Sequence, residues 1–409
     1  MASERPEPPR NATTDVTAVP HAASPTVSWF ELFYDLVVVA AVSMTNDVFL
    51  AQPSLETAAL GAVTMTALAW VWFLTTLYNN LFPGQDIVRR LLLVGQMAAI
   101  AIAGLAVDQE RGLENRDGLI AYAVALVIVA ALIAWGGRST HTPIQVRSIV
   151  PILVAAAICA AGALDADSRS GIYLIVGVLV SMVPILLTQY AQWQNRSMLR
   201  LEHLRERLGL FVLIILGLGF AELLDALHAT GAIPRADLFA LLFILSFAVW
   251  WIYFDGTFSE HTDLSSVRWR LTLLAHLTLV FGIGGTLDVL ILLISGHASD
   301  LGDAALTYFV ACLAVVLLSF AALTFTAKGR LGVQGRAQIA CAVLILIVGV
   351  VLVPQDNTST YGVIGLSAAI VILNAVIAVS ADVAANRHQW RTSLGVALRG
   401  EDPQPPTGD

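Results

Sequence analysis

The chain has 409 residues, of which 57% are hydrophobic and only 13% are charged, and its formal net charge is −8. Soluble globular domains carry about 25% charged residues, so this chain lacks the polar side chains needed to cover a large soluble fold. The composition also excludes disorder over most of the chain and is typical of an all-α polytopic membrane protein. The lipid bilayer is therefore its expected partner, and nucleic acid is not.

Residues 1–26 are rich in Pro, Ala, Thr and charged residues and contain no apolar segment ahead of a small-residue cleavage site. We therefore predict a disordered tail and no signal peptide. Residues 382–409 end in a polar, Pro-rich sequence and form a second predicted tail.

Twelve apolar runs follow the first tail, each close to the 20 or so residues that a helix needs to cross a bilayer. Short segments with Pro, Gly and charged residues separate them. The fifth run is the weakest because Pro151 interrupts it. The predicted spans are residues 28–50, 57–79, 88–107, 119–136, 147–164, 171–193, 208–228, 237–257, 268–294, 304–326, 337–353 and 361–381.

The basic residues predict the orientation of these spans. If the N-terminus, every second loop and the C-terminus share one side, that side holds all but four of the 22 Lys and Arg residues. Basic residues concentrate in cytoplasmic loops, so this asymmetry places both termini in the cytoplasm and supports an even number of spans. The four exceptions are Arg111, Arg116, Arg169 and Arg235.

The second half of the chain resembles the first weakly, with matching segments in the same order and two of them at the same offset of 180 residues. The pattern predicts two parallel six-helix repeats, residues 27–193 and 208–381, joined by a cytoplasmic linker at 194–207. Such repeats occur in transporters, whose sites lie between the halves near the midplane. The alternative is that any two sets of apolar helices with Trp and Arg ends look alike. The matched segments are residues 70–73 with 250–253, and 90–96 with 270–276.

Two carboxylates lie in the first span. Glu31 and Asp35 are four residues apart and so share one face of a helix. Two carboxylates this close repel each other if both are ionised, so one must be protonated or both must be paired. The functional interpretation is a pair that handles protons or cations. The structural interpretation is an interhelical clamp to an Arg or a Trp.

Three further polar residues fall at a similar depth in other spans, namely Gln96, Asp255 and His276. Ionisable groups within spans are costly and normally face the bundle interior. Together with Glu31 and Asp35 they form the main candidate site, for an ion, a proton or an interhelical polar contact. A hydrogen-bonded structural role is the alternative for His276.

Four residues of the seventh span and the segment before it are secondary candidates. A glutamate in a first helical turn is also favoured by the helix dipole, which is the structural alternative for Glu206. The secondary candidates are His203, Glu206, Arg207 and Glu222.

Motifs of soluble enzymes are absent from the sequence. It contains no GxxxxGK[ST], GxSxG or HExxH and no paired cysteines with zinc spacing. Cys159, Cys312 and Cys341 lie within apolar runs, so we predict buried thiols. We expect no enzymatic activity, no cofactor and no metal site.

Several stretches together resemble the bacterial low temperature requirement A membrane proteins. Residues 31–37 read Glu-Leu-Phe-Tyr-Asp-Leu-Val, similar to that family's Glu-Leu-Phe-Phe-Asp-Leu-Val. Residues 203–210 resemble its His-x-x-Glu-Arg-x-Gly-Leu run, and residues 250–255 its Trp-Trp-x-Tyr-Phe-Asp stretch, which the helix bearing His276 follows. The resemblance covers residues 28 to 390.

One departure from the family pattern concerns the seventh span. The family usually has Leu-Gly-Glu-Ser there, whereas this chain has Leu216-Gly217-Leu218-Gly219 and a glutamate only at Glu222. A glutamate that is functional in relatives would be missing here or displaced by one turn.

The resemblance implies a multi-pass protein of the bacterial cytoplasmic membrane, with no established biochemical activity. Together with the ionisable residues, it predicts a transporter or channel for a cation or a proton-coupled small solute. The alternative is a non-transporting membrane protein that supports envelope function or cold growth through lipid or partner contacts.

Overall fold

The fold is all-α over the part of the chain that the structure describes. A computed structural model describes residues 28–82, 84, 86–107, 115–139, 144–165, 170–187, 200–229, 236–257, 268–295, 302–354 and 359–385. The helices are α1 (Trp29–Ser43), α2 (Asn46–Ala51), α3 (Leu55–Leu81), α4 (Ile87–Leu105), α5 (Arg116–Gly136), α6 (Ile144–Leu164), α7 (Ser170–Leu187), α9 (Leu201–Ala229), α10 (Ala236–Trp251), α11 (Arg268–Ile294), α12 (Asp303–Lys328), α13 (Gly332–Leu352) and α14 (Thr360–Ala385).

Each of the twelve predicted spans corresponds to helix in the described residues. The first span is α1 followed by α2, and the eighth is α10 followed by the π-helical segment η2 (Ile252–Thr257). Within the described residues, nine helices are long and apolar enough to cross a membrane. Three shorter apolar helices are Ser148–Leu164, Gly171–Ile185 and Phe239–Phe254. The chain is therefore a multi-pass membrane protein, and the prediction of an all-α fold is confirmed.

The predicted tails and linker fall largely outside the described residues. This holds for residues 1–26, for most of 382–409 and for part of 194–207. The first residues assigned to the C-terminal tail, 382–385, instead continue α14.

The start of α1 is encoded locally. Ser28 is the N-cap: its hydroxyl accepts from the backbone N–H of Glu31, and the Glu31 carboxylate accepts from the backbone N–H of Ser28 at 3.1 Å. This capping box satisfies N–H groups that the first turn leaves without helical partners. It also fixes Glu31 at the very start of the helix.

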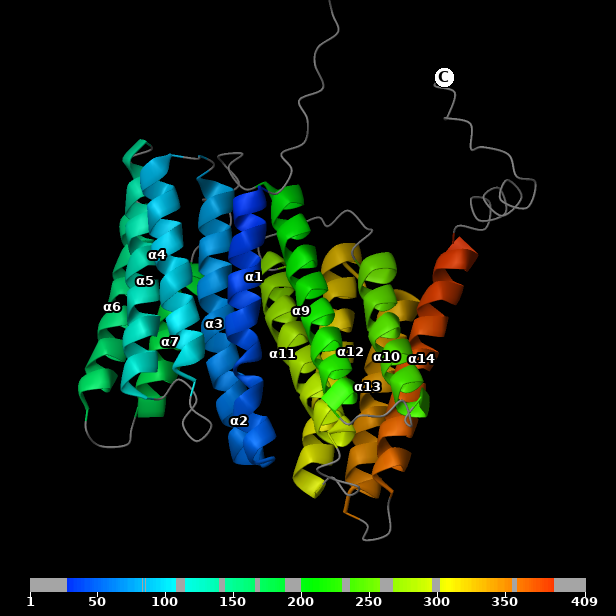
Figure 1. Cartoon of the computed structure of the whole chain (residues 1–409). Helices are drawn as coiled ribbons and strands as arrows, with labels where there is room; N and C mark the ends of the chain where they lie inside the picture. Colours follow the sequence, from blue (N-terminus) through cyan, green and yellow to red (C-terminus); the bar gives the residue numbers. More distant parts are fainter. Residues whose placement is uncertain are drawn as a thin grey trace, which may run out of the picture.

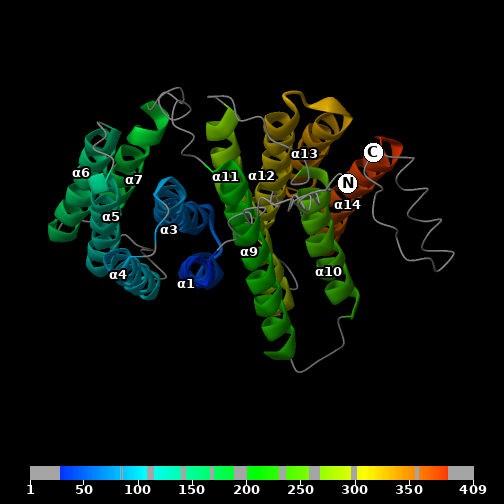
Figure 2. The same ribbon diagram turned by 90° about the horizontal axis from the view of Figure 1, so that it is seen from above.

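Figures 1 and 2 show how the helices are arranged. Helices α4 to α7 group on one side and α9 to α14 on the other, with α1 and α3 between them. Helix α1 contacts α4 and α9, and α3 contacts α5, α7, α9, α11 and α12. We call the contact of α1–α3 with α9, α11 and α12 the seam.

Apolar side chains cover the outward faces of the helices. Val350 is 76% exposed and Leu105 is 81% exposed. Apolar faces of this kind are stable in contact with lipid hydrocarbon and unfavourable in contact with water, so they are expected on helices that cross a bilayer. Polar side chains such as Asp35, Arg207 and Gln338 are instead buried between helices.

Candidate functional site

Two pairs of ionisable side chains join α1 to α9 at the seam. His203 Nε2 lies 3.4 Å from Glu31 Oε2, and Arg207 Nη2 lies 2.6 Å from Asp35 Oδ1. Each helix contributes residues four positions apart, so the pairs lie one helical turn from each other. Because both pairs keep the same order along the chain, α1 and α9 run parallel. We call these four residues the charge ladder.

The inner pair of the charge ladder is fully buried. The side chains of Asp35 and Arg207 are both 0% exposed. The indole N–H of Trp72 donates to the same Asp35 oxygen at 2.6 Å, and Arg207 Nη2 donates to Thr76 Oγ1 at 3.3 Å. A buried charge of this kind is tolerated only when it is paired and hydrogen-bonded. Helices α1, α3 and α9 are thus locked at one point.

Aromatic packing surrounds this pair. The Trp72 ring stacks on Phe211 with centroids 3.8 Å apart, and the Arg207 guanidinium carbon lies 6.0 Å from the Trp72 ring centroid. The stack excludes water from one side of the ion pair, which strengthens the electrostatic interaction. Among the described groups, Asp35 Oδ2 and Arg207 Nε and Nη1 have no hydrogen-bond partner. The pair therefore keeps capacity to bind a further polar group.

The outer pair has a defined proton arrangement. Asn80 Oδ1 accepts from the backbone N–H of Arg200 at 2.9 Å, and its Nδ2 donates to the Arg200 carbonyl at 2.7 Å. The same Nδ2 lies 3.5 Å from His203 Nδ1, which is therefore the acceptor side of the imidazole. This assigns the ring proton to Nε2, which faces Glu31. His203 Nε2 is thus the nitrogen that donates to the Glu31 carboxylate.

Gln96 lies next to the charge ladder but bonds no member of it. Its Oε1 accepts from Thr75 Oγ1 at 3.0 Å, and its Nε2 lies 3.4 Å from the Ala125 carbonyl. Thr75 is one turn from Trp72 on α3, so Gln96 adjoins the ladder through that helix. It links α3, α4 and α5.

His276 belongs to a separate contact in the other half of the molecule. Its Nδ1 lies 2.7 Å from the Thr272 carbonyl, so Nδ1 carries a proton, and its Nε2 lies 3.0 Å from the Tyr253 hydroxyl. The geometry matches a neutral, hydrogen-bonded imidazole. Asp255 follows Tyr253 within the π-helical segment, and its side chain lies outside the part that the structure describes.

Glu206 and Glu222 occupy different surroundings. Glu206 is exposed, whereas Glu222 is half-buried at the far end of α9. Leu218 and Glu222 are four residues apart and line the same small cavity, which Val39 of α1 and Gly284 of α11 also line. A glutamate moved from 218 to 222 therefore still faces the space between α1, α9 and α11.

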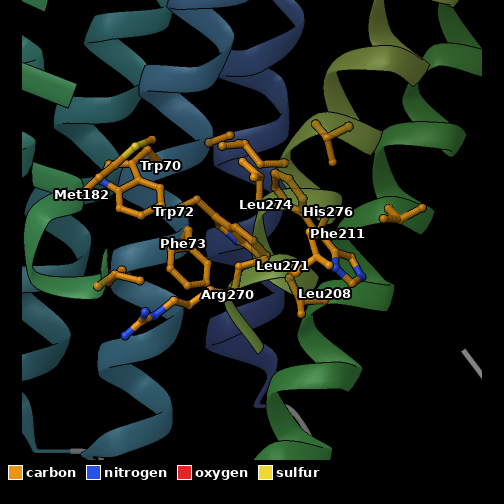
Figure 3. Close-up of a pocket in the computed structure, with 16 residues that line it drawn as sticks. Trp70, Trp72, Phe73, Met182, Leu208, Phe211, Arg270, Leu271, Leu274 and His276 are labelled. Atoms are coloured by element: carbon orange, nitrogen blue, oxygen red, sulfur yellow. The ribbon is translucent and has the colours of Figure 1, made fainter. Parts of the chain in front are cut away.

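A larger cavity lies beside the charge ladder, between α3, α7, α9 and α11 (Figure 3). Its volume is about 320 Å³. Trp72 is shared, because its ring lines the cavity while its N–H binds Asp35. His276 also lines the cavity, on the α11 side. Two of the predicted site regions therefore border one apolar space, although Asp35 and His276 have different hydrogen-bond partners.

The residues of α3 are the part of the site that sequence reasoning missed. Trp72, Thr76 and Asn80 all bind the charge ladder or its support. A signal was present, because four polar residues interrupt the apolar run near the end of this span. All four are buried: Thr75, Thr76, Asn79 and Asn80.

Metal ligands do not gather in the described part of the chain, where no group of three or more His, Cys, Asp or Glu residues is found. The three cysteines are buried and free, as predicted.

Comparison with known proteins places the chain in a family. A search of curated proteins gives no match. The family model described as "Bacterial low temperature requirement A protein (LtrA)" matches residues 26–391, most of the chain. Those residues include α1, α3, α9 and the charge ladder that joins them. The chain therefore belongs to the bacterial low temperature requirement A family.

Proposed function

We propose that the protein is a transporter of the bacterial cytoplasmic membrane for a cation or a proton-coupled small solute. The observation that carries this proposal is the buried charge ladder across the seam. Ionisable residues inside membrane helices are rare and mark ion pathways and proton relays. In transporters built from repeats, such groups lie between the two halves.

The pattern of helix contacts supports two six-helix halves. With α1 and α2 counted as one helix and α10 and η2 as one, each half has six. In both halves the first helix contacts the second and third, the second contacts the fourth and sixth, the fourth contacts the sixth, and the third to sixth contact in sequence. One set of contacts thus describes both halves, as duplication of a six-helix unit would produce.

Polar contacts at matching positions support the same relation. Gln96 and His276 occupy equivalent positions in the two matched segments, and each bonds the second helix of its own half, through Thr75 and Tyr253 respectively. The parallel course of α1 and α9, the first helix of each half, agrees with repeats related by an axis along the membrane normal.

The proposal includes the boundaries and orientation predicted from the sequence. The proposed halves are residues 27–193 and 208–381, and both termini are proposed to be cytoplasmic because basic residues concentrate on their side. No enzymatic role is proposed, because the chemistry of the ladder suits charge and proton transfer.

The proposed proton coupling depends on Glu31 of the charge ladder. Its side chain is 12% exposed, against 0% for Asp35. A proton on Glu31 would remove the negative charge opposite His203 and weaken the outer pair. The inner pair would then carry the contact between α1 and α9 alone. Proton binding would thus change how firmly the halves are joined.

Reconstitution into liposomes tests the proposal. We expect wild-type protein to move protons or Na⁺ or K⁺ down imposed gradients, followed with an internal pH dye and ion-selective electrodes. Glu31→Gln should lower the rate about tenfold. Glu206→Gln, an exposed glutamate near the same end of α9, should stay within twofold. Absence of flux in wild type under all these gradients would overturn the proposal.

The two bonds to one oxygen of Asp35 favour a second candidate. Asp35 Oδ1 accepts hydrogen bonds from both Arg207 and Trp72, as expected of a clamp between helices. A non-transporting protein that supports the envelope through lipid or partner contacts needs only this clamp. Under that function, ladder variants lose stability in detergent while wild-type liposomes show no flux.

A further inference from the structure

We propose that the cavity between α3, α7, α9 and α11 binds one acyl chain of an anionic phospholipid, with the lipid head group at Arg270. The inference goes beyond the proposed transport and stands without it, because it rests on the walls, the opening and the charge of the cavity alone.

The walls of the cavity select an apolar occupant. They consist of aliphatic side chains together with the aromatic rings of Trp70, Trp72, Phe73 and Phe211. Its volume, about 320 Å³, reaches the lower end of the range for ligand sites. Water needs two to four polar partners to be held in a cavity, and these walls offer few.

Two of the residues that border the cavity use their polar groups in other contacts, whereas the indole N–H of Trp70 has no hydrogen-bond partner among the described residues. The Trp72 N–H donates to Asp35, and both nitrogens of His276 face Tyr253 and Thr272. Within the apolar space, hydrocarbon is therefore the best-matched content.

Charge is present at one end. Arg270 lies in the first turn of α11, and Val280, ten residues on, lines the same cavity. At 1.5 Å per residue the cavity follows α11 for about 15 Å. In Figure 3 the Arg270 guanidinium lies at the edge of the labelled residues and is directed away from the aromatic rings, whereas His276 lies on the opposite side. An elongated apolar space with a cation at its end complements an acyl chain with an anionic head group.

The exposed side of the cavity indicates that the acyl chain comes from the surrounding bilayer. Leu274 lines the cavity yet is 55% exposed, and Met182 of α7 is half-buried. Exposed faces of membrane-spanning helices contact lipid. A chain can therefore enter sideways from the surrounding bilayer without crossing water.

An occupant would act on the charge ladder through Trp72. An acyl chain in the cavity packs against the Trp72–Phe211 stack. This contact restrains the indole with its N–H on the Asp35 carboxylate. A bound lipid would thus stabilise the seam between the two halves.

Photo-crosslinking tests the site directly. Full-length protein in detergent is irradiated with phosphatidylglycerol that carries a diazirine in one acyl chain, and the labelled peptides are mapped by mass spectrometry. We expect labelling concentrated on α7 and α11 at the cavity, for example at Met182 and Leu277. Leu274→Trp, which narrows the opening, should reduce this labelling at least fivefold. Leu318→Trp, at an exposed leucine of α12, should not.

The head-group contact has its own control. Arg270→Gln should lower labelling by phosphatidylglycerol to the level seen with phosphatidylcholine of the same chain. Arg90→Gln, which removes an exposed arginine of α4, should leave it unchanged.

Labelling spread evenly over outer helix faces, or unchanged in Leu274→Trp, would overturn the acyl-chain site. Equal labelling by the two lipids in wild type would overturn the head-group assignment. If Leu274→Trp does not fold, the wild-type map decides. None of these outcomes depends on ion flux.

Discussion

Asp35 is the residue on which the seam most depends. One of its oxygens accepts from both Arg207 and Trp72, and neither partner of the ion pair touches solvent. A buried pair is weak evidence for net stabilisation, because desolvation of both charges opposes their attraction. Loss of one partner is different, since it leaves the other charge buried and unpaired.

Asp35→Asn should destabilise the protein by about 3–5 kcal/mol, because it strands the Arg207 guanidinium. Thermal unfolding in detergent, followed by tryptophan fluorescence, measures this. The double variant Asp35→Asn/Arg207→Gln should recover part of the loss, and the four proteins form a double-mutant cycle. Single variants that are each as stable as wild type would contradict the clamp.

Asp86 offers a pH-dependent prediction outside the membrane. It is the N-cap of α4. The backbone N–H of Arg89 and the indole N–H of Trp135 both donate to its carboxylate, and these hydrogen bonds lower the pKa of Asp86. A carboxylate with a pKa lowered by folding stabilises the folded state above its ordinary pKa near 4, and this contribution is lost as the pH falls further.

Wild type should therefore exceed Asp86→Ala in melting temperature at pH 6, and the difference should shrink as the pH falls below about 4. Glu56→Ala, in the first turn of α3, serves as the control, because the N-cap of that helix is Ser54, whose side chain accepts from the backbone N–H of Thr57. A difference independent of pH would show that the charge of Asp86 does not matter.

At the scale of elements, small residues set how closely α1 and α4 approach. A Cβ added at Gly104 would lie 2.8 Å from the backbone Cα of Ala41. Backbone cannot move aside as a flexible side chain can. Small residues at membrane helix contacts permit this close approach.

Gly104→Ala should therefore destabilise the protein by about 1–3 kcal/mol. Gly217→Ala is the matched control: a Cβ there meets nothing within 4 Å, so the change should be neutral or stabilise by up to about 1 kcal/mol. Melting temperatures of both variants in the same detergent give the comparison. Equal effects would refute the close contact of α1 with α4.

At the scale of the whole molecule, the two groups of helices meet chiefly through α1, α3, α9 and α11. The charge ladder and the 320 Å³ cavity lie along this one boundary. Interactions at this boundary therefore hold the two groups of helices together. The larger part of each half packs away from it.

The orientation of the molecule is a separate prediction. A reporter fused after residue 382 should be cytoplasmic, and one inserted at residue 112 should be external, because the basic residues concentrate on the side of the termini. Paired alkaline phosphatase and fluorescent protein fusions measure both positions. Activity of phosphatase after residue 382 would reverse the assigned topology.

Much of the fold could be predicted from the sequence because, inside a bilayer, each spanning segment must form its backbone hydrogen bonds within itself. The apolar runs therefore corresponded to helices one by one, and Pro151 did not prevent α6 from forming. The π-helical segment after Trp251 was not predicted, since the residues there continue the apolar pattern. The break between α1 and α2 at Thr45 was not predicted either.

By itself the sequence determined the class of protein, the approximate spans and the presence of carboxylates in the first of them. It named His203 and Arg207 but did not pair them with Glu31 and Asp35. Those partners lie in distant parts of the chain, and only the packing of α1 against α9 brings them together. Hydrophobicity and helical periodicity determine structure only within a few helical turns. A contact between helices that are distant in sequence depends on how all the helices pack, and this is decided only by the tertiary structure.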